Sequence, residues 1–505
     1  MNASEVEATK AAIALAAAAL LVWGAWLRRS GRPDAHRGVR DAALAVLAFA
    51  ALLGSWNFLR FHYPGFVHAD LVPYTLGTKY FPELGYTRLY ECIAVADFEA
   101  GLGPRVRQRA LTDLETYELR DTRRILAEPG RCKASFAPQR WAAFERDVAW
   151  FRGVFAPEGW EGLQRDHGFN ATPLWAAMGA LFAAGPASAT QVLALASLDV
   201  LLDLVAFAAL VWGFGWRATA VALVYWGTNR VAGFDWTGGA FLRHDWLAAT
   251  FVGLACLRRG SPLAAGILFG TAALLRAVPS VLFLGPGLAA LVHLVRTRRL
   301  LPRREILRLA AGAAIAAAVL LPLSALRVGP GAWRDFAENL AHHRSVPASN
   351  TLGLRTALSF THAGRFALVL ESERDPGRAW KERRSAAFAE RRALYLAGAA
   401  AWLALCTVAA AGQPLWIAAI LGTGAIPFVL DGACYYTAFL AAWGLLWLRR
   451  ESVGAALCAL AAVEAAIGAL LVEPDDAFTA TSVAVLAFVG AATWLVATAR
   501  ARAVT

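Results

Sequence analysis

The sequence predicts an all-α polytopic membrane protein, and three observations support this prediction. The chain has 505 residues, of which 58% are hydrophobic, and its mean hydropathy is +0.47. The apolar residues form repeated runs of about twenty, the length that an α-helix needs to cross a bilayer. Arginines cluster between these runs, as is typical of cytoplasmic loops. A soluble core of this chain length could not bury so much apolar sequence.

The arginine clusters and the apolar runs together define the expected spans. Placing helices between the clusters gives about thirteen transmembrane helices, with both long polar loops, 60–170 and 327–392, outside the cytoplasm. Because each crossing moves the chain to the other side of the membrane, this placement of the loops requires that the short apolar segment 173–185 does not cross. Prolines bound that segment, which suits a helix in the outer interface or a re-entrant one. The expected spans are 11–27, 41–59, 190–212, 216–229, 245–257, 263–276, 280–295, 309–326, 393–411, 414–431, 435–448, 453–471 and 479–499.

Charge also predicts the orientation of the chain. Glu5 and Glu7 precede the first span with only Lys10, so we expect the N-terminus outside and this span to be retained rather than cleaved as a signal peptide. The basic C-terminus should be cytoplasmic. The net charge of +12 follows the same loops, so binding to nucleic acid is not expected. We expect a multi-pass protein of a bacterial-type inner (plasma) membrane.

This topology divides the chain into four parts. The first is an extra N-terminal span with a basic cytoplasmic loop, and the second is a membrane module that contains the first external loop. A second external loop follows, in which an amphipathic helix should lie on the outer membrane surface. The last part consists of C-terminal membrane helices. The corresponding ranges are 1–40, 41–326, 327–392 and 393–505.

The cysteines agree with this orientation. Cys92 and Cys132 share the first external loop, whereas the other four cysteines lie in or beside apolar helices. In an oxidising periplasm the pair can form a disulfide, which would stabilise the loop by roughly 4 kcal/mol on the chain-entropy model. No cysteine and histidine spacing indicates zinc. The adjacent His342 and His343 would diverge on a helix, so no metal site is expected.

Several motifs resemble the GT-C superfamily of integral-membrane glycosyltransferases. A span is followed by an external loop that opens with Asp70, and the loop ends in the segment 166–175 before a short interfacial helix. That element often reads Tyr-Pro-Pro-Leu or His-Pro-Pro-Leu in the family, and this chain keeps Pro173 and Leu174. Later parts, up to about residue 448, are similar to the polyprenol-phosphate-mannose-dependent branch. They are the turn before 245–257, the pattern of Gly266, Gly270, Arg276 and Pro279, and the segments 333–339 and 349–352.

The resemblance implies that a sugar is moved from a polyprenyl-phosphate donor to a glycan, lipid or protein acceptor outside the cytoplasm, among membrane lipids. It places the catalytic carboxylate at Asp70, which would take the proton of the acceptor hydroxyl as a general base. A single base indicates an inverting single displacement, because a retaining mechanism requires a second nearby carboxylate. The alternative is that Asp70 caps the helix whose first turn contains Pro73, and the two roles are compatible.

Charged and aromatic residues near the outer boundary are candidates for the rest of this site. Arg276 ends an apolar helix, where a charge is costly unless it is paired or faces a cavity, and its guanidinium suits a lipid phosphate. It could instead extend to the headgroups. Other donor-phosphate candidates are Arg243, His244, Arg344 and Arg355. Candidates for sugar or acceptor contact, although aromatic belts and solvated loop ends are common alternatives, are Lys79, Tyr80, Tyr86, Asp166, His167, Asn350 and Tyr435.

Two other functions remain open at the level of sequence. A transporter or lipid flippase could use Arg276 and the helices that glycine and proline interrupt, although no repeat symmetry accompanies them. A noncatalytic scaffold could bind partners through its external loop. The chain has no P-loop and no strand-embedded GxGxxG, which fits a donor carried by lipid rather than by nucleotide. Convergence of Asp70 and Arg276 on one external cavity would favour the enzyme.

Overall fold

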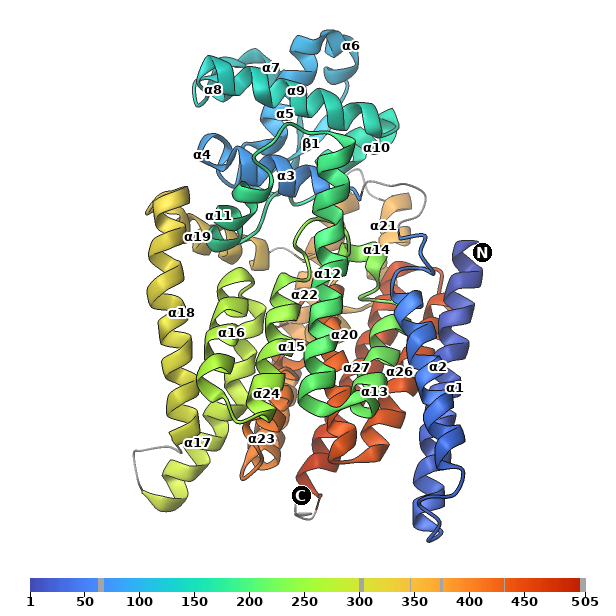
Figure 1. The fold of residues 1–505 in the computed structure, drawn as a ribbon. Coiled ribbons are helices and arrows are strands. Elements are labelled where there is room, and N and C mark those ends of the chain that lie inside the picture. Colours follow the sequence, from blue (N-terminus) through green and yellow to red (C-terminus); the bar gives the residue numbers. More distant parts are fainter. Residues whose placement is uncertain (62–67, 299–303, 346, 373–375, 431, 500–505) are drawn as a thin grey trace.

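The computed structural model describes residues 1–61, 68–298, 304–345, 347–372, 376–430 and 432–499. Within these residues, eight helices are long and apolar enough to cross a membrane. They form one bundle (Figure 1), so the chain is a multi-pass, almost entirely helical membrane protein. The eight are Ala3–Arg29 (α1), Arg37–Ser55 (α2), Ala189–Phe214 (α12), Val278–Thr297 (η3 and α17), Arg304–Val328 (α18), Arg392–Ala410 (α23), Glu451–Leu470 (α26) and Pro474–Ala497 (α27).

Shorter apolar helices occupy the remaining expected spans. A helix of 14 residues, such as α16, is about 21 Å long, less than the hydrocarbon core of a bilayer. These helices pack inside the bundle, where α16 contacts both α15 and α18. A Cβ at Gly266 would collide with the carbonyl of Leu309, so the glycine permits close contact with α18. The shorter helices are Trp216–Thr228 (α13), Asp245–Arg258 (α15), Pro262–Leu275 (α16), Leu415–Gly422 (α24) with Ile426–Leu430 (η5), and Cys434–Phe439 (η6) with Leu440–Trp443 (α25) and Gly444–Leu448 (η7).

The first long loop folds into a compact domain beyond one end of the bundle (Figure 1), which we call the loop domain. Its core is aromatic, with Phe144, Phe151 and Trp160 fully buried. Its single hairpin is antiparallel, with Ala110 opposite Asp121. Its elements are Leu71–Lys79 (α3), Phe81–Leu84 (α4), Leu89–Asp97 (α5), Phe98–Leu102 (η1), Gly103–Val106 (α6), Ala110–Asp113 (β1), Glu118–Asp121 (β2), Thr122–Ala127 (α7), Gly130–Lys133 (α8), Pro138–Val154 (α9), Pro157–Gly162 (α10) and Leu163–Arg165 (η2).

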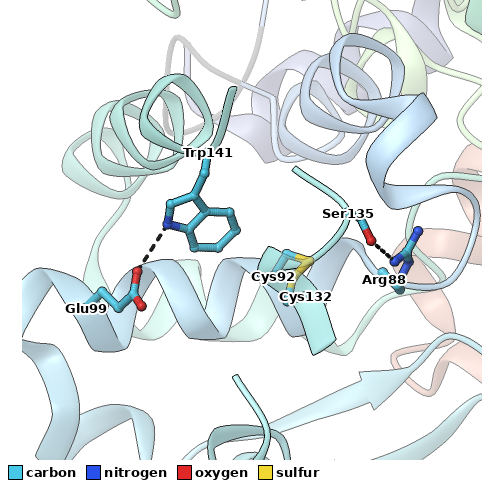
Figure 2. The surroundings of a disulfide bond; sticks show 6 residues. All are labelled: Arg88, Cys92, Glu99, Cys132, Ser135 and Trp141. Carbon is cyan, nitrogen blue, oxygen red and sulfur yellow. Dashed lines mark hydrogen bonds between the residues drawn. A yellow bond between two sulfur atoms is a disulfide. The ribbon is translucent and has the colours of Figure 1, made fainter. Parts of the chain in front are cut away.

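The predicted disulfide is present in the loop domain. Cys92 on α5 and Cys132 on α8 are bonded, with their Cα atoms 5.6 Å apart and a sequence separation of 40. Figure 2 shows two hydrogen bonds, one on either side of the disulfide, that join the region of α5 to residues beyond α8. Arg88 donates to Ser135, and Trp141 Nε1 donates to Glu99 Oε2 over 3.1 Å. The disulfide therefore links segments that side-chain contacts already hold together.

The second long loop lies at the same end of the bundle as the loop domain. Tyr117 Oη donates to Asn339 Oδ1 over 3.2 Å, and Lys381 Nζ donates to the carbonyl of Tyr117 over 3.3 Å. Both loops therefore face one side of the protein, and α27 finishes near the opposite end (Figure 1). The elements of the second loop are Ala332–Ser345 (α19), Leu354–Ser359 (α20), His362–Gly364 (η4), Phe366–Ser372 (α21) and Pro376–Glu390 (α22).

Two helices expected at the interface have different surroundings. The helix Pro173–Phe182 (α11) has 10 residues, about 15 Å, and packs between α3 and α18. It is too short to cross a bilayer. The position of α22 on the outer membrane surface stays a prediction, and the structure adds that one face of this helix is buried in protein. Trp380 and Arg384 on this face both bond to Asp475 at the start of α27.

Candidate functional site

A cavity of about 550 Å³ lies where the loop domain, the bundle and the second loop meet. Ligand sites commonly have volumes of roughly 300–1,000 Å³ and contain a few convergent polar groups. Asp70 and Arg276, which are 206 positions apart by their numbers, both line this cavity. The other predicted residues in its lining are Asp166, His167, Arg243, Asn350, Arg355 and Tyr435.

Asp70 faces an arginine rather than capping its helix. It stands at the position before α3, but its side chain makes no capping hydrogen bond. Its Oδ2 lies 3.2 Å from Nη2 of Arg243, and its side chain is 24% exposed. The carboxylate therefore faces the cavity with one charged partner and retains access to a ligand. The capping alternative does not describe how the Asp70 side chain is used in this structure.

Arg243 belongs to a loop that a buried carboxylate of α12 holds in place. Oδ1 of Asp199 accepts the backbone N–H groups of Arg243 and His244, over 2.7 and 3.0 Å. The ring of His244 lies 2.9 Å from Oδ1 of Asp203, one helical turn further along α12. His244 is thus buried and paired with a carboxylate, so the prediction that it binds the donor phosphate is not supported. Sequence reasoning missed Asp199 and Asp203, although two acidic residues in an apolar span are a recognisable signal.

Tyr74 on α3 holds two guanidinium groups around its ring. Cζ of Arg243 lies 4.2 Å from the ring centroid, and Cζ of Arg276 lies 5.4 Å from it, within the range of cation–π attraction. Arg276 also donates to Tyr74 Oη over 3.4 Å, and Tyr74 Oη donates to Asn170 Oδ1 over 2.7 Å. Arg276 is buried among these groups and does not extend toward headgroups. The sequence alone assigned Tyr74 no role in the site.

Both guanidinium groups keep an unused donor. Within the described residues, Nη1 of Arg243 and Nη2 of Arg276 are buried and have no hydrogen-bond partner. Buried polar groups are nearly always satisfied, and leaving one unpaired is costly, especially when it carries a charge. An anion in the cavity would satisfy both donors, because guanidinium groups bind phosphate and carboxylate oxygens through charge-assisted hydrogen bonds. The arrangement is therefore suited to an anionic ligand.

The second loop and the segment before α25 supply another wall. The N–H of Cys434 donates to the carbonyl of Asn350 over 2.7 Å, which fixes Asn350 beside the cavity. Tyr435 places its ring 5.6 Å from Cζ of Arg243. Arg355 on α20 lies with Cζ 4.7 Å from the ring centroid of Phe388. This wall thus combines an amide, a phenol and a guanidinium.

An aromatic cluster joins the loop domain to α19 at the outer rim. Tyr117 stacks on His342 with a centroid distance of 5.0 Å, and the rings of His167 and His343 lie 5.1 and 5.7 Å from it. Asp166, which is about half exposed, lies 3.4 Å from Nδ1 of His167. Burial lowers the pKa of His343 to about 4, so this ring is neutral at pH 7. In the described part of the chain, no group of three His, Cys, Asp or Glu side chains could hold a metal ion.

Three predicted sugar contacts lie elsewhere. Lys79 and Tyr80 both bond to Oδ2 of Asp147, over 2.6 and 2.7 Å, and Tyr86 donates to the carbonyl of Ala171 over 2.9 Å. They are packed in the loop domain and do not line the cavity, because Asp147 of α9 holds Lys79 and Tyr80 and the rings of Phe81 and Phe169 pack on Tyr86. Contact between these residues and a sugar in the cavity is therefore not supported. The side chain of Arg344 lies outside the described residues.

The fold and the cavity define the class of this protein only in structural terms. The chain is a multi-pass helical membrane protein with a charged cavity between its bundle and its two long loops. No protein-family model matches the chain, and no curated protein or solved structure matches it significantly. The chemistry must therefore be inferred from the cavity itself.

Proposed function

We propose that the protein is a membrane glycosyltransferase, with a GT-C-like fold, that moves a sugar from a polyprenyl-phosphate donor to an extracytoplasmic acceptor. One observation carries the proposal. A partly exposed carboxylate, Asp70, and two buried guanidinium groups with unused donors, Arg243 and Arg276, line the same cavity at one end of the bundle. Such a cavity has a base for an acceptor hydroxyl and cations for a phosphate.

The proposed reaction is a single inverting displacement. Asp70 takes the proton of the acceptor hydroxyl while the acceptor oxygen bonds to the anomeric carbon of the donor sugar. The bond between that carbon and the phosphate oxygen breaks, and polyprenyl phosphate leaves with the electron pair. Arg276 binds the phosphate equally in the intact donor and in the departing group, and the free donor of Arg243 stabilises the charge that develops on the departing phosphate. The contact with Arg243 holds the Asp70 carboxylate at the cavity, where the acceptor hydroxyl would lie.

The experiment that tests this proposal is sugar transfer by the purified full-length protein. Radiolabelled polyprenyl-phosphate mannose and polyprenyl-phosphate glucose would be supplied in detergent with a lipid and glycan extract as acceptor. We expect label to move from the donor to the acceptor. Asp70→Asn should lower the rate by about a hundredfold or more, because it keeps the size of the side chain but removes the base. The exposed Glu118 on β2 offers a matched control, and Glu118→Gln should leave the rate unchanged.

Two results would contradict the proposal. If the wild-type protein transferred label from neither donor, the assigned reaction would be wrong. If it moved the intact donor across a bilayer without breaking the sugar–phosphate bond, the transporter or flippase alternative would take its place. Full activity of Asp70→Asn at saturating donor would instead reject Asp70 as the base while leaving the transfer reaction established.

A further inference from the structure

The charges around the cavity are only partly balanced by the protein. Arg243 is paired with Asp70 over 3.2 Å, and Arg384 is paired with Asp475 over 3.2 Å. Both arginines line the cavity, and each has a carboxylate of the chain as its counterion. The other acidic residue in the lining, Asp166, is about half exposed and lies beside His167 at the outer rim. Among the described residues it forms no ion pair with an arginine.

Two further arginines of the lining have no such counterion. Among the described residues, neither Arg276 nor Arg355 forms an ion pair with a carboxylate. Arg276 is buried, and Arg355 is half-buried with Phe388 against one face of its guanidinium. A charge that is partly removed from water costs free energy unless an opposite charge compensates it. Asp245 is buried within electrostatic reach of Arg276 but forms no ion pair with it among the described residues, so both guanidinium groups remain open to negative charges of the ligands.

The donor of the proposed reaction supplies only one of these charges. A polyprenyl-phosphate sugar is a phosphodiester, which carries a single negative charge. Arg276 shares the Tyr74 ring with Arg243, and its guanidinium also lies 5.8 Å from the ring of Trp175, so it belongs to the wall made by α3 and α11. Arg355 packs instead on α22, against the ring of Phe388. One phosphate held at Arg276 leaves Arg355 without a counterion.

We infer that the acceptor is itself anionic, and that Arg355 binds a carboxylate or phosphate group of this acceptor. The inference rests on the proposed function, because that function assigns one anion to the donor. The lining near Arg355 is rich in neutral hydrogen-bonding groups, which suit the hydroxyls of a glycan or a lipid headgroup. These neighbours are Asn350, Thr351, Thr356, Ser359 and Ser385. Asp70 would then act on a hydroxyl of a molecule whose charged group is bound at Arg355.

Binding of soluble sugar anions tests the inference without requiring turnover. Full-length protein in detergent would first be saturated with polyprenyl phosphate, which occupies the proposed donor site. Glucose 6-phosphate, glucuronate and neutral glucose would then be titrated in separate arms by isothermal calorimetry. The two anionic sugars distinguish a phosphate from a carboxylate, and glucose reports on contacts that need no charge. We expect at least one anionic sugar to bind about tenfold or more tightly than glucose.

Variants assign this preference to one side chain. Arg355→Gln should remove the preference for the anionic sugar, while Arg355→Lys should retain part of it because the positive charge remains. Arg334→Gln is the matched control, because Arg334 lies in the same loop, is 83% exposed and pairs with Glu338. Thermal melting of each variant verifies that it is folded. If Arg355→Gln does not fold, the comparison between Arg355→Lys and the wild type decides the question.

The outcomes separate this inference from the proposed function. Equal binding of glucose and both sugar anions, or anion binding that Arg355→Gln leaves intact, would overturn the inference even if sugar transfer were established. Anion binding that depends on Arg355, in a protein without transferase activity, would support a second anion site and refute the proposed reaction. If polyprenyl pyrophosphate bound through Arg355 and excluded the sugar anions, both charges would belong to the donor and the inference would be wrong.

Discussion

Replacing Arg276 with glutamine should weaken donor binding far more than it slows the chemical step. Arg276 is buried, its Nη2 has no hydrogen-bond partner within the described residues, and its Nη1 makes only a long contact of 3.4 Å to Tyr74. The donor phosphate would provide the missing partner. Glutamine keeps a polar group at the end of α16 but removes the charge, so the variant tests the charge–phosphate interaction in particular.

The expected magnitude follows from the number and type of bonds lost. One hydrogen bond between a charged donor and a phosphate contributes about 1.5–3 kcal/mol, since both groups lie in a partly desolvated cavity. This corresponds to an increase of roughly tenfold to 150-fold in the dissociation constant of the donor. The rate at saturating donor should change much less, because the pair between Asp70 and Arg243 does not involve Arg276. Asp70→Asn should instead lower the rate at saturating donor and leave the dissociation constant of the donor nearly unchanged.

The assay is a titration of polyprenyl-phosphate sugar with transfer measured at each concentration, for the wild type, Arg276→Gln and Asp70→Asn. Arg334→Gln serves as the control for loss of an arginine at an exposed position. KM should rise for Arg276→Gln, and kcat should fall for Asp70→Asn. The reasoning would be refuted if Arg276→Gln left KM unchanged, or if it lowered kcat as much as Asp70→Asn does, because Arg276 would then not be a donor-binding group.

Three further predictions concern stability and orientation. Replacing Cys92 and Cys132 with serine should lower the stability of the loop domain by about 4 kcal/mol, measured by denaturant unfolding, because the disulfide closes a loop of 40 residues; an unchanged midpoint would contradict this. The pKa of His343 is lowered from 6.5 to about 4, so stability should fall as pH falls from 6.5 to 4, and His343→Gln should flatten this part of the melting-temperature profile. An impermeant maleimide should label Arg334→Cys in intact cells but Arg37→Cys only after permeabilisation. Both side chains are more than half exposed, and the expected topology has them on opposite sides of the membrane.

Apolar periodicity and charge predicted the approximate positions of the apolar helices in the bundle, but not the helices of the loop domain. The expected span 393–411, for example, differs from α23 by one residue at each end. The first helix starts well before its expected span at 11–27, because Asn2 and Glu5 form a capping box that begins the helix in polar sequence. An apolar run marks the part of a helix suited to the membrane, whereas caps determine where the helix begins. The crossing of the shorter helices remains a prediction.

The candidate site was only partly predictable, since sequence spacing identifies the face of a helix but not the surface that covers it. Lys79 and Tyr80 have the spacing and chemistry of a sugar-binding rim, but α9 brings Asp147 against them from 67 positions beyond Tyr80. Asp70 and Arg276 could be placed at the same outer boundary because each lies next to an apolar run. The side of the membrane on which the two residues lie follows from the order of the spans alone, so predicting it required no knowledge of tertiary packing.

Contacts within the protein fix the positions of the charged groups in the cavity. Asp199 lies within an apolar helix and is fully buried, and its Oδ1 is satisfied by the two N–H groups that fix the backbone of Arg243. The Tyr74 ring then lies 4.2 Å from Cζ of the Arg243 guanidinium, and Asp70 pairs with this guanidinium over 3.2 Å. A cation fixed in this way needs no rearrangement when an anion binds, which is the condition for effective electrostatic stabilisation of a departing phosphate. Substitution of Asp199 should therefore disturb the site through the position of Arg243, although Asp199 itself does not line the cavity.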